Sequence, residues 1–199
     1  IIYIHVPVAA VAMAGYMVMA FAGAINLVWR MKLAEMVMKC AAPIGAAITF
    51  LALFTGAIWG KPTWGTWWVW DARITSVLVL FFLYLGFISL VNAFDSPARG
   101  ERAAAILALV GAVNVPIIKF SVDWWNTLHQ PAAVFRMDGP TIDPSLLWPL
   151  LIMALGFTAL FLFLHMVAMR TEIWRRRIAT LRRASAREQR STARPVLAE

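Results

Sequence analysis

Five long apolar stretches constrain this chain more than any other feature of its sequence. They cover roughly residues 6–29, 41–60, 73–94, 103–120 and 146–169. Each is close to the length, about 20 residues, that a helix needs to cross the apolar core of a bilayer. A segment surrounded by lipid must satisfy its own backbone hydrogen bonds, so each stretch is predicted to be helical. The predicted fold class is therefore an all-α, polytopic transmembrane helix bundle.

The composition agrees with a membrane protein and excludes several other classes. Hydrophobic residues make up 62% of the 199 residues, whereas soluble domains average about 45–50%. The single cysteine, Cys40, excludes an internal disulfide framework and a cysteine-rich metal cluster. The formal net charge is +8, but half of the 18 lysines and arginines lie in residues 170–199. That concentration indicates a segment at the membrane surface and argues against nucleic-acid binding.

Lysine and arginine counts predict the orientation of the chain in the membrane. If the 30–39 loop, the 95–102 loop and residues 170–199 share one side, that side carries 14 of these residues and the other carries 4. By the positive-inside rule, the side with 14 is cytoplasmic. We therefore expect a transmembrane domain over residues 1–169 and a basic cytoplasmic tail that begins as an amphipathic helix and then frays into disorder. The outer face would be formed by three segments, which are residues 1–5, 61–72 and 121–145.

Prolines predict where two helices start and where one bends. DSP at 95–97 and DPS at 143–145 are typical of helix starts, with Ser96 or Asp143 as the N-cap and proline in the first turn. Pro116 lies inside the fourth apolar stretch and is expected to bend it.

The sequence carries no recognisable catalytic motif. It has no glycine-rich phosphate loop, no nucleophile elbow, no HExxH motif and no internal repeat. We therefore expect a binding or transfer function and not an enzyme.

The outer-face segment KPTWGTWWVWDARITS, residues 61–76, is exceptionally rich in tryptophan. Its candidate binding residues are Trp64, Trp67, Trp68, Trp70 and Asp71. All of these except Trp70 follow an i, i+3, i+4, i+7 spacing, so a helix would place them on one face and Trp70 on another. Two interpretations are open. The indoles can anchor the segment at the membrane interface, or they can form a platform for a flat ligand, with Gly65 permitting close approach.

Two of the three histidines are expected at the same outer face. His5 precedes the first apolar stretch, in YIHVP, and His129 lies in the later outer loop, in DWWNTLHQP. Imidazole is a common axial ligand of haem iron, so the two can hold an iron from opposite sides while indoles pack on the porphyrin. Trp124 and Trp125 supply a second aromatic pair. His165 lies near the cytoplasmic end of the last stretch and is not expected to be a ligand.

Polar residues of the outer face are further candidates. Arg73 and Arg136 can pair with haem propionates through charge-assisted hydrogen bonds. Arg73 can equally pair with Asp71 or cap the start of its own helix. Asp123 and Asn126 can orient an imidazole, or they can be solvated loop residues.

These motifs together resemble a known group of proteins. WGTWWVWDARIT, with HVP before the first stretch and LHQP in the later loop, resembles the haem-handling membrane proteins that carry a tryptophan-rich WWD segment. Within that group the chain is similar, over nearly its whole length, to the CcmC family of the cytochrome c maturation system. Relatives that attach haem to apocytochrome tend to have a proline and an acidic residue after the WD, where this chain has Ala72, Arg73 and Thr75. The family usually has six spans, so a further span is expected before Ile1.

The resemblance implies a function and a set of partners. It implies haem b at the periplasmic face of the bacterial inner membrane, with His5 and His129 as axial ligands and residues 64–71 as the platform. The haem would pass to the haem chaperone CcmE, within a complex that includes the ABC transporter subunits CcmA and CcmB and the small membrane protein CcmD. ATP hydrolysis by the transporter would release the loaded chaperone, and this chain itself carries no ATP-binding motif.

Three alternatives remain open from the sequence. A cytochrome b-like electron-transfer subunit would hold haem between histidines inside the spans, whereas His5 and His129 lie at or beyond span ends. A haem permease would need a polar conduit, and the spans offer few polar residues. A haem lyase is disfavoured by the DAR that follows the tryptophans.

Overall fold

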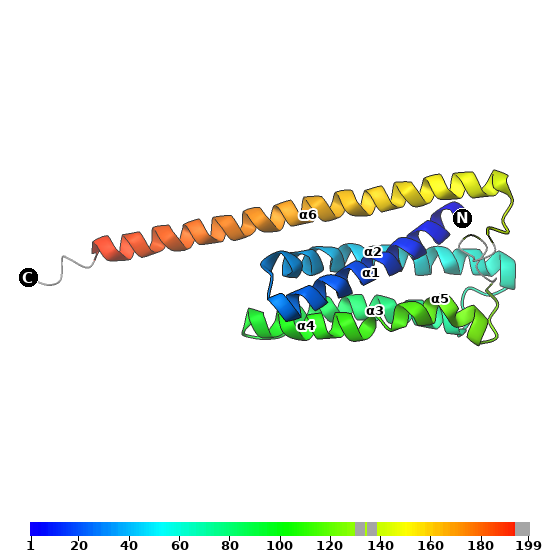
Figure 1. Cartoon of the computed structure of the whole chain (residues 1–199), viewed down its shortest axis with the longest axis horizontal. Coiled ribbons are helices and arrows are strands. Elements are labelled where there is room, and N and C mark those ends of the chain that lie inside the picture. Colours follow the sequence, from blue (N-terminus) through cyan, green and yellow to red (C-terminus); the bar gives the residue numbers. More distant parts are fainter. Residues whose placement is uncertain (130–133, 135–138, 194–199) are drawn as a thin grey trace, which may run out of the picture.

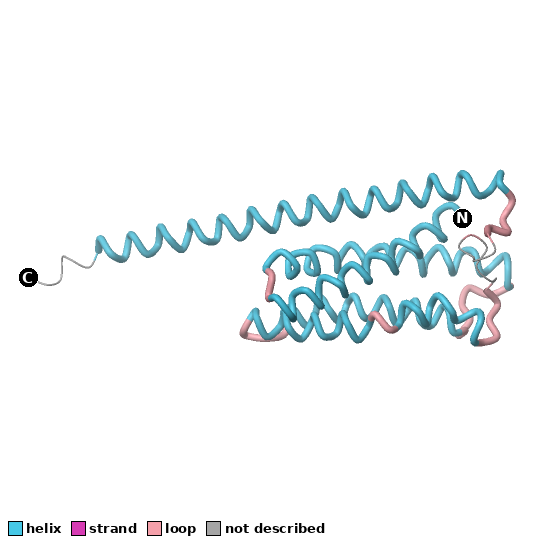
Figure 2. Tube along the Cα trace, in the orientation of Figure 1, coloured by secondary structure: helices cyan, strands magenta, loops and turns pink. Residues whose placement is uncertain are grey.

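The computed structural model describes residues 1–129, 134 and 139–193, and the described residues form helices and no strands. The helices are α1 (Ile2–Trp29), α2 (Lys32–Trp64), α3 (Ala72–Asn92), α4 (Pro97–Gly111), α5 (Asn114–Trp124) and α6 (Pro144–Ala193). Figure 1 shows α1 to α5 packed as a bundle of roughly aligned helices, with α6 running beside it and continuing well past it. The loops gather at the two ends of this bundle, except for the short break between α4 and α5, which lies part-way along it (Figure 2). The predicted all-α bundle is confirmed.

The five predicted spans are also confirmed. Five helical segments are long and apolar enough to cross a membrane, with α4 and α5 together forming the fourth, Pro97–Trp124. The break between α4 and α5 falls at Ala112 and Val113, four and three residues before Pro116. Proline has no N–H for the carbonyl four residues earlier, and its ring crowds that carbonyl. The expected bend at Pro116 is therefore confirmed, displaced by one turn.

The core of the bundle combines small residues with a few large aromatic ones. Tyr16 and Tyr84 are fully buried and meet edge to face, with ring centroids 5.0 Å apart. The Tyr84 hydroxyl donates to the carbonyl of Ala12 at 2.8 Å. Buried alanines of α1, α2 and α4 let the helices approach closely around this pair. Close packing of small residues is a main source of stability between helices in a membrane, and it makes α1 and α2 a firm support for side chains at their ends.

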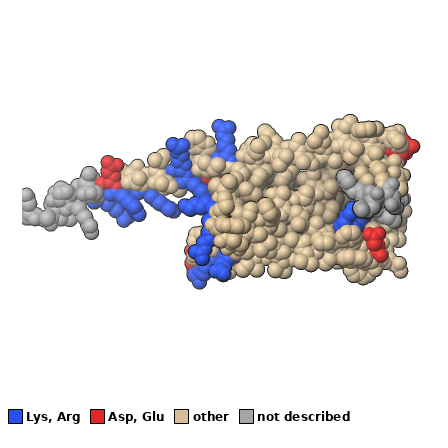
Figure 3. All heavy atoms as spheres, in the orientation of Figure 1, with Lys and Arg blue, Asp and Glu red and all other residues tan. Residues whose placement is uncertain are grey.

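The two ends of the bundle differ in chemistry. The tryptophan end is formed by residues 1–5, 59–73 and 120–129, and the arginine end by residues 29–32, 92–102 and 170–193. Figure 3 shows lysine and arginine side chains gathered where the bundle stops and along the projecting part of α6. The three segments that the charge count assigned to one side do lie at one end.

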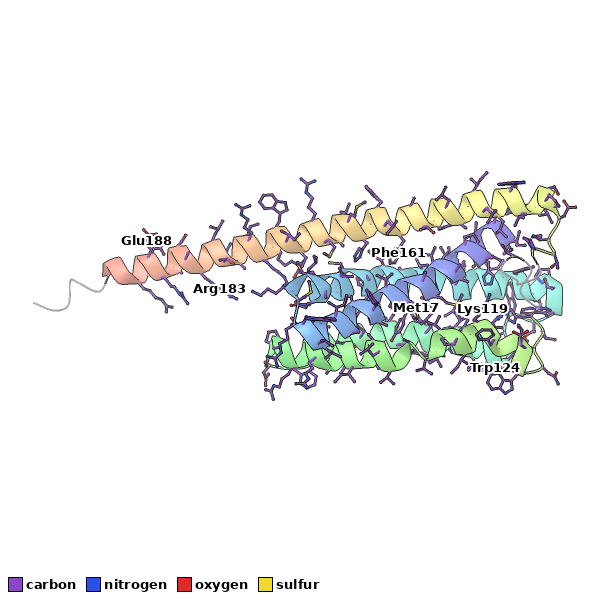
Figure 4. The ribbon with its side chains drawn as sticks, viewed as in Figure 1. Met17, Lys119, Trp124, Phe161, Arg183 and Glu188 are labelled. Carbon is purple, nitrogen blue, oxygen red and sulfur yellow. The ribbon has the colours of Figure 1, made fainter. Side chains whose placement is uncertain are left out.

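Helix α6 is longer than the sequence suggested. The tail was expected to begin as a helix and then to fray. The helix continues to Ala193, and residues 194–199 lie outside the described residues. Its projecting part is rich in arginine and alanine, which have high helix propensity. Arg176 donates to Glu172 one turn earlier at 2.9 Å and also to the buried Glu35 of α2, which ties α6 to the bundle. Figure 4 shows Arg183 and Glu188 on the part of α6 that extends beyond this tie.

Candidate functional site

The tryptophan segment is not the continuous helix that its spacing allowed. Helix α2 ends at Trp64, and Gly65 adopts a left-handed conformation with φ of 77° as its C-cap. Glycine is the usual residue in this position because it has no Cβ to clash. The single helical face predicted for Trp64, Trp67, Trp68 and Asp71 is therefore wrong, since residues 65–71 form an irregular connection to α3.

Asp71 links the tryptophan segment to His129. One carboxylate oxygen accepts the backbone N–H of Ile74 at 2.8 Å and so caps the N-terminus of α3. The other oxygen lies 2.8 Å from Nδ1 of His129. A carboxylate can only accept, so Nδ1 of His129 carries the proton and Nε2 is left as the basic nitrogen.

The ionisation states of this pair follow from burial and hydrogen bonding. Burial lowers the pKa of His129 from its usual value, and the hydrogen bond with Asp71 only partly opposes this effect. Burial opposes ionisation of Asp71, but the bonds from Ile74 and His129 outweigh it, so the pKa of Asp71 is lowered. The pair is therefore a neutral imidazole donating to a carboxylate. This arrangement is the one that commonly orients a metal-binding histidine.

Two further contacts fix His129 in its loop. Its backbone N–H donates to the hydroxyl of Thr127 at 2.8 Å. Its ring lies against the indole of Trp64, edge to face, with ring centroids 4.7 Å apart. His129 is thus held by the side chains of Asp71, Thr127 and Trp64.

His5 lies in the first turns of α1 and is held by α2. Its Nδ1 is 3.0 Å from the carbonyl oxygen of Ala52 and 3.2 Å from the hydroxyl of Thr55. Because a carbonyl only accepts, Nδ1 carries the proton here too, and Nε2 is the basic nitrogen. The ring lies edge to face on Trp59 at 5.6 Å between centroids, and a Cβ on Gly56 would come within 2.9 Å of its Cε1.

The structure brings the two predicted histidines to the same place. The last turns of α2 carry both Trp59 and Trp64, on which the rings of His5 and His129 pack. Neither Nε2 has a hydrogen-bond partner among the described residues. The sequence analysis missed Trp59 and Gly56, although a spacing of three to four residues along α2, from Ala52 through Gly56 to Trp59, was a readable signal for one helix face.

The remaining tryptophans of the segment do not touch the histidines in the described contacts. Trp67 and Trp70 are 58% and 74% exposed. Trp68 packs edge to face on Trp70 with centroids 5.4 Å apart. The indole N–H of Trp68 is buried and has no hydrogen-bond partner within the described part of the chain.

Trp124 and Trp125 form a separate aromatic pair. Their rings are 5.8 Å apart and more than half exposed, and Trp124 also stacks on Phe120. Figure 4 shows Trp124 pointing away from the bundle. The described ring contacts of Trp124 and Trp125 are with each other and with Phe120, and do not include His5 or His129.

Arg73 is bound mainly to the C-terminal turn of α5. Its guanidinium donates to the Ser121 hydroxyl at 3.3 Å and to the carbonyls of Ile118 and Lys119 at 3.4 and 3.2 Å. These bonds fasten the start of α3 to the end of α5, from which the His129 loop departs. Arg136, the other predicted cation, lies outside the described residues.

His165 is remote from this site along α6. It lies 21 residues beyond the start of that helix, which is about 31 Å at helical rise. Its ring stacks on Phe161, and its Nδ1 is buried with no partner among the described residues. Its placement agrees with the expectation that it does not join the other two histidines.

The described side chains indicate which form of metal this site suits. A cavity of about 300 Å³ beside Asp71 is lined by Val69, Trp70, Asp71, Asn126, Thr127 and Leu128. Among the residues that the structure describes, no group of three or more His, Cys, Asp or Glu side chains is placed to hold a bare metal ion. Two imidazoles with free Nε2 atoms, surrounded by indoles, suit a metal that a flat macrocycle already holds by four bonds.

Comparison with known proteins gives a consistent family. The family model for Heme exporter protein C (CcmC) matches residues 1–184. The chain is 60% identical over 186 residues to Heme exporter protein C of Bradyrhizobium diazoefficiens, covering 94% of this chain and 71% of that protein. It is 54% identical over 173 residues to Heme exporter protein C of Escherichia coli K12, covering 87% of this chain and 69% of the relative.

A more distant relative extends the similarity to mitochondria. A ccmC-like mitochondrial protein of cytochrome c biosynthesis from Marchantia polymorpha is 45% identical over 157 residues, which is 79% of this chain and 66% of that protein. Because the family model matches most of the chain and bacterial relatives match at high identity, the chain belongs to the Heme exporter protein C family.

Proposed function

We propose that this chain binds haem b at the tryptophan end, with Nε2 of His5 and Nε2 of His129 as the two axial ligands of the iron. The observation that carries the proposal is the state of the two imidazoles. Each has its Nδ1 proton committed to an oxygen acceptor, Ala52 or Asp71, and each leaves Nε2 unpaired among the described residues. Histidines that bind a metal are typically oriented by such a bond at the other ring nitrogen.

The residues around the histidines fit a haem group. Trp59 and Trp64 pack on the two imidazoles and supply apolar, aromatic surface. The unpaired indole N–H of Trp68 and the side of Arg73 not engaged with α5 offer donors to haem carboxylates. Arg136 remains a predicted cation for the same purpose. Haem, when bound, supplies the iron and the porphyrin that are to be carried, while this chain binds, orients and shields them.

The proposed activity is transfer and not catalysis. Membership of the family supports a role in haem handling for the maturation of c-type cytochromes. We propose that the chain delivers haem to the chaperone CcmE, and that it works with the ABC transporter subunits CcmA and CcmB and with CcmD. The exposed tryptophans Trp67, Trp70, Trp124 and Trp125 leave an aromatic surface at the same end for an incoming protein.

The proposed location follows from the charge distribution. With lysine and arginine concentrated at the arginine end, the positive-inside rule puts that end and residues 170–199 in the cytoplasm. The tryptophan end then faces the periplasm across the bacterial inner membrane. Residues 1–169 would be the haem-handling transmembrane domain.

Absorption spectra of the purified protein test the binding proposal. Oxidised and reduced spectra are recorded for the wild type, His5→Ala and His129→Ala after loading with haem. We expect a low-spin, six-coordinate spectrum in the wild type and its loss or shift in each variant. If both variants kept the wild-type spectrum, the assignment of these two ligands would be wrong.

A transfer assay tests the delivery proposal. The haem-loaded protein is mixed with purified, haem-free CcmE, and the haem spectrum of each protein is followed after separation. Movement of haem to CcmE is the expected result. A haem that stays bound, shows a stable reversible midpoint potential and reacts with quinone would instead favour a cytochrome b-like electron-transfer subunit.

A further inference from the structure

We propose that Thr127 is a positioning residue, whose hydroxyl sets the orientation of His129 and thereby controls how fast the site releases haem. The inference rests on the proposed function and names the part of the site that governs release. It starts from the observation that His129 lies in a connection after α5, where no helix fixes its backbone.

The Thr127 hydroxyl lies next to both the backbone N–H and the ring of His129. Its oxygen accepts the backbone N–H of His129 at 2.8 Å, which closes a short turn two residues long. The same oxygen lies 3.5 Å from Nδ1 of His129. One hydroxyl therefore contacts both the backbone and the ring of His129.

The start of this connection, at the end of α5, is held by contacts that do not involve Thr127. Arg73, two residues beyond Asp71, donates to the last turn of α5 and so keeps the start of α3 against the end of α5. With the α5 end of the connection anchored in this way, the local turn at residues 127–129 and the ring angle are what set the position of His129. Those are the degrees of freedom that the Thr127 hydroxyl restricts.

The test compares variants that differ by one hydroxyl. Thr127→Val keeps the branched shape and removes the hydroxyl, whereas Thr127→Ser keeps the hydroxyl. Thr127→Ala removes it with a smaller side chain. Thr158→Val is the matched control, because Thr158 makes a hydroxyl bond to Ala154 on an exposed part of α6 remote from the histidines. Helical circular dichroism of the haem-free forms verifies folding, and position 127 lies outside the helices.

The readouts are the spin state of the bound haem and its rate of transfer to excess apomyoglobin. We expect Thr127→Val and Thr127→Ala to release haem roughly 10-fold faster, the range for residues that support a metal ligand, with a shift toward a five-coordinate, high-spin spectrum. Thr127→Ser and Thr158→Val should match the wild type.

Two results would overturn the inference. One is wild-type release and spectra in Thr127→Val and Thr127→Ala. The other is equal impairment in Thr127→Ser, because the hydroxyl would then not be the cause. A wild type that takes up no haem, or whose spectrum is unaffected by loss of either histidine, would instead overturn the proposed function itself.

Discussion

His5 is carried by a membrane helix and His129 by a connection between helices, and the two are tethered by different chemistry. His5 is bound to a backbone carbonyl of α2 and fits against Gly56, so packing between α1 and α2 fixes it. His129 is bound to the carboxylate of Asp71 and to Thr127, so polar side chains fix it. In both arrangements Nε2 has no hydrogen-bond partner among the residues that the structure describes.

Because the two histidines are held differently, we expect them to have different roles in the proposed site. A ligand held by helix packing keeps its position, because moving it would disturb the packing of α1 against α2. A ligand held by hydrogen bonds in a loop can move at the cost of a few bonds. The His5 half would therefore retain haem while the His129 half opens for transfer. The following predictions probe the two halves, starting with the largest expected effect.

Added volume should damage the His5 half most. In Gly56→Ala, the new Cβ would lie 2.9 Å from Cε1 of His5, so the ring must turn away from its present position. We expect haem affinity to fall by about 100-fold, the upper end of the range for positions that support a metal ligand. Equilibrium haem titration measures this.

A second glycine provides the control for that variant. In Gly156→Ala on α6, the added Cβ meets nothing within 4 Å, and alanine favours a helix more than glycine by about 1 kcal/mol. Gly156→Ala should bind haem like the wild type. Equal affinities for Gly56→Ala and the wild type would show that packing does not hold His5.

Removing the charge of Asp71 should weaken haem binding through His129, because the Asp71 carboxylate holds the His129 ring. Asn is nearly as good an N-cap as Asp, so Asp71→Asn should leave the thermal stability of the haem-free protein almost unchanged. Without the carboxylate, we expect haem affinity to fall roughly 10-fold. Titration and thermal unfolding measured on the same samples separate the two effects. A large loss of stability with normal affinity would make Asp71 only a helix cap.

Removing the indole that packs on either histidine should lower haem affinity by a smaller factor. Trp64→Leu and Trp59→Leu remove ring contacts at 4.7 and 5.6 Å. Such contacts contribute about 1 kcal/mol, so we expect roughly a five-fold loss of haem affinity, larger for Trp64. Trp148→Leu, a change at an exposed tryptophan of α6, is the control and should have no effect. The comparison fails if Trp148→Leu is as damaging as the other two.

Acidification should release haem only below the usual pKa of histidine. Burial lowers the pKa of His129 from 6.5, so protons compete less for Nε2, and haem retention should be constant from neutral pH down to 6.5. A pH titration of the haem spectrum tests this. Wild-type release centred above 6.5 would contradict it.

Most of the fold could be predicted from the sequence because lipid permits few solutions. The five apolar stretches and the bend before Pro116 follow from span length and from the missing proline N–H. Counting the spans also predicts that His5 and His129 lie at the same end of the bundle. The length of α6 could not be judged, because the tie between Arg176 and Glu35 joins residues 141 positions apart.

The details of the site were less predictable. The tryptophan spacing suggested a helix, but Gly65 ends α2 directly after Trp64, before the other three tryptophans of the segment. The glycine was a signal for a helix end that the helical spacing concealed. The partner of His5 is a backbone carbonyl, which every residue has, so only the packing of α1 on α2 could reveal it. Asp71 was identified from the motif, whereas its double role as helix cap and histidine partner required the structure.

The most direct test of the account is chemical rescue of each ligand. His5→Gly and His129→Gly are loaded with haem, and electron paramagnetic resonance of the ferric protein is recorded with and without added imidazole. The account predicts that each variant loses the low-spin signal of the wild type and regains it when imidazole occupies the vacated position. A low-spin signal that persists in both variants without imidazole would show that other side chains bind the iron, and would contradict the assignment of His5 and His129.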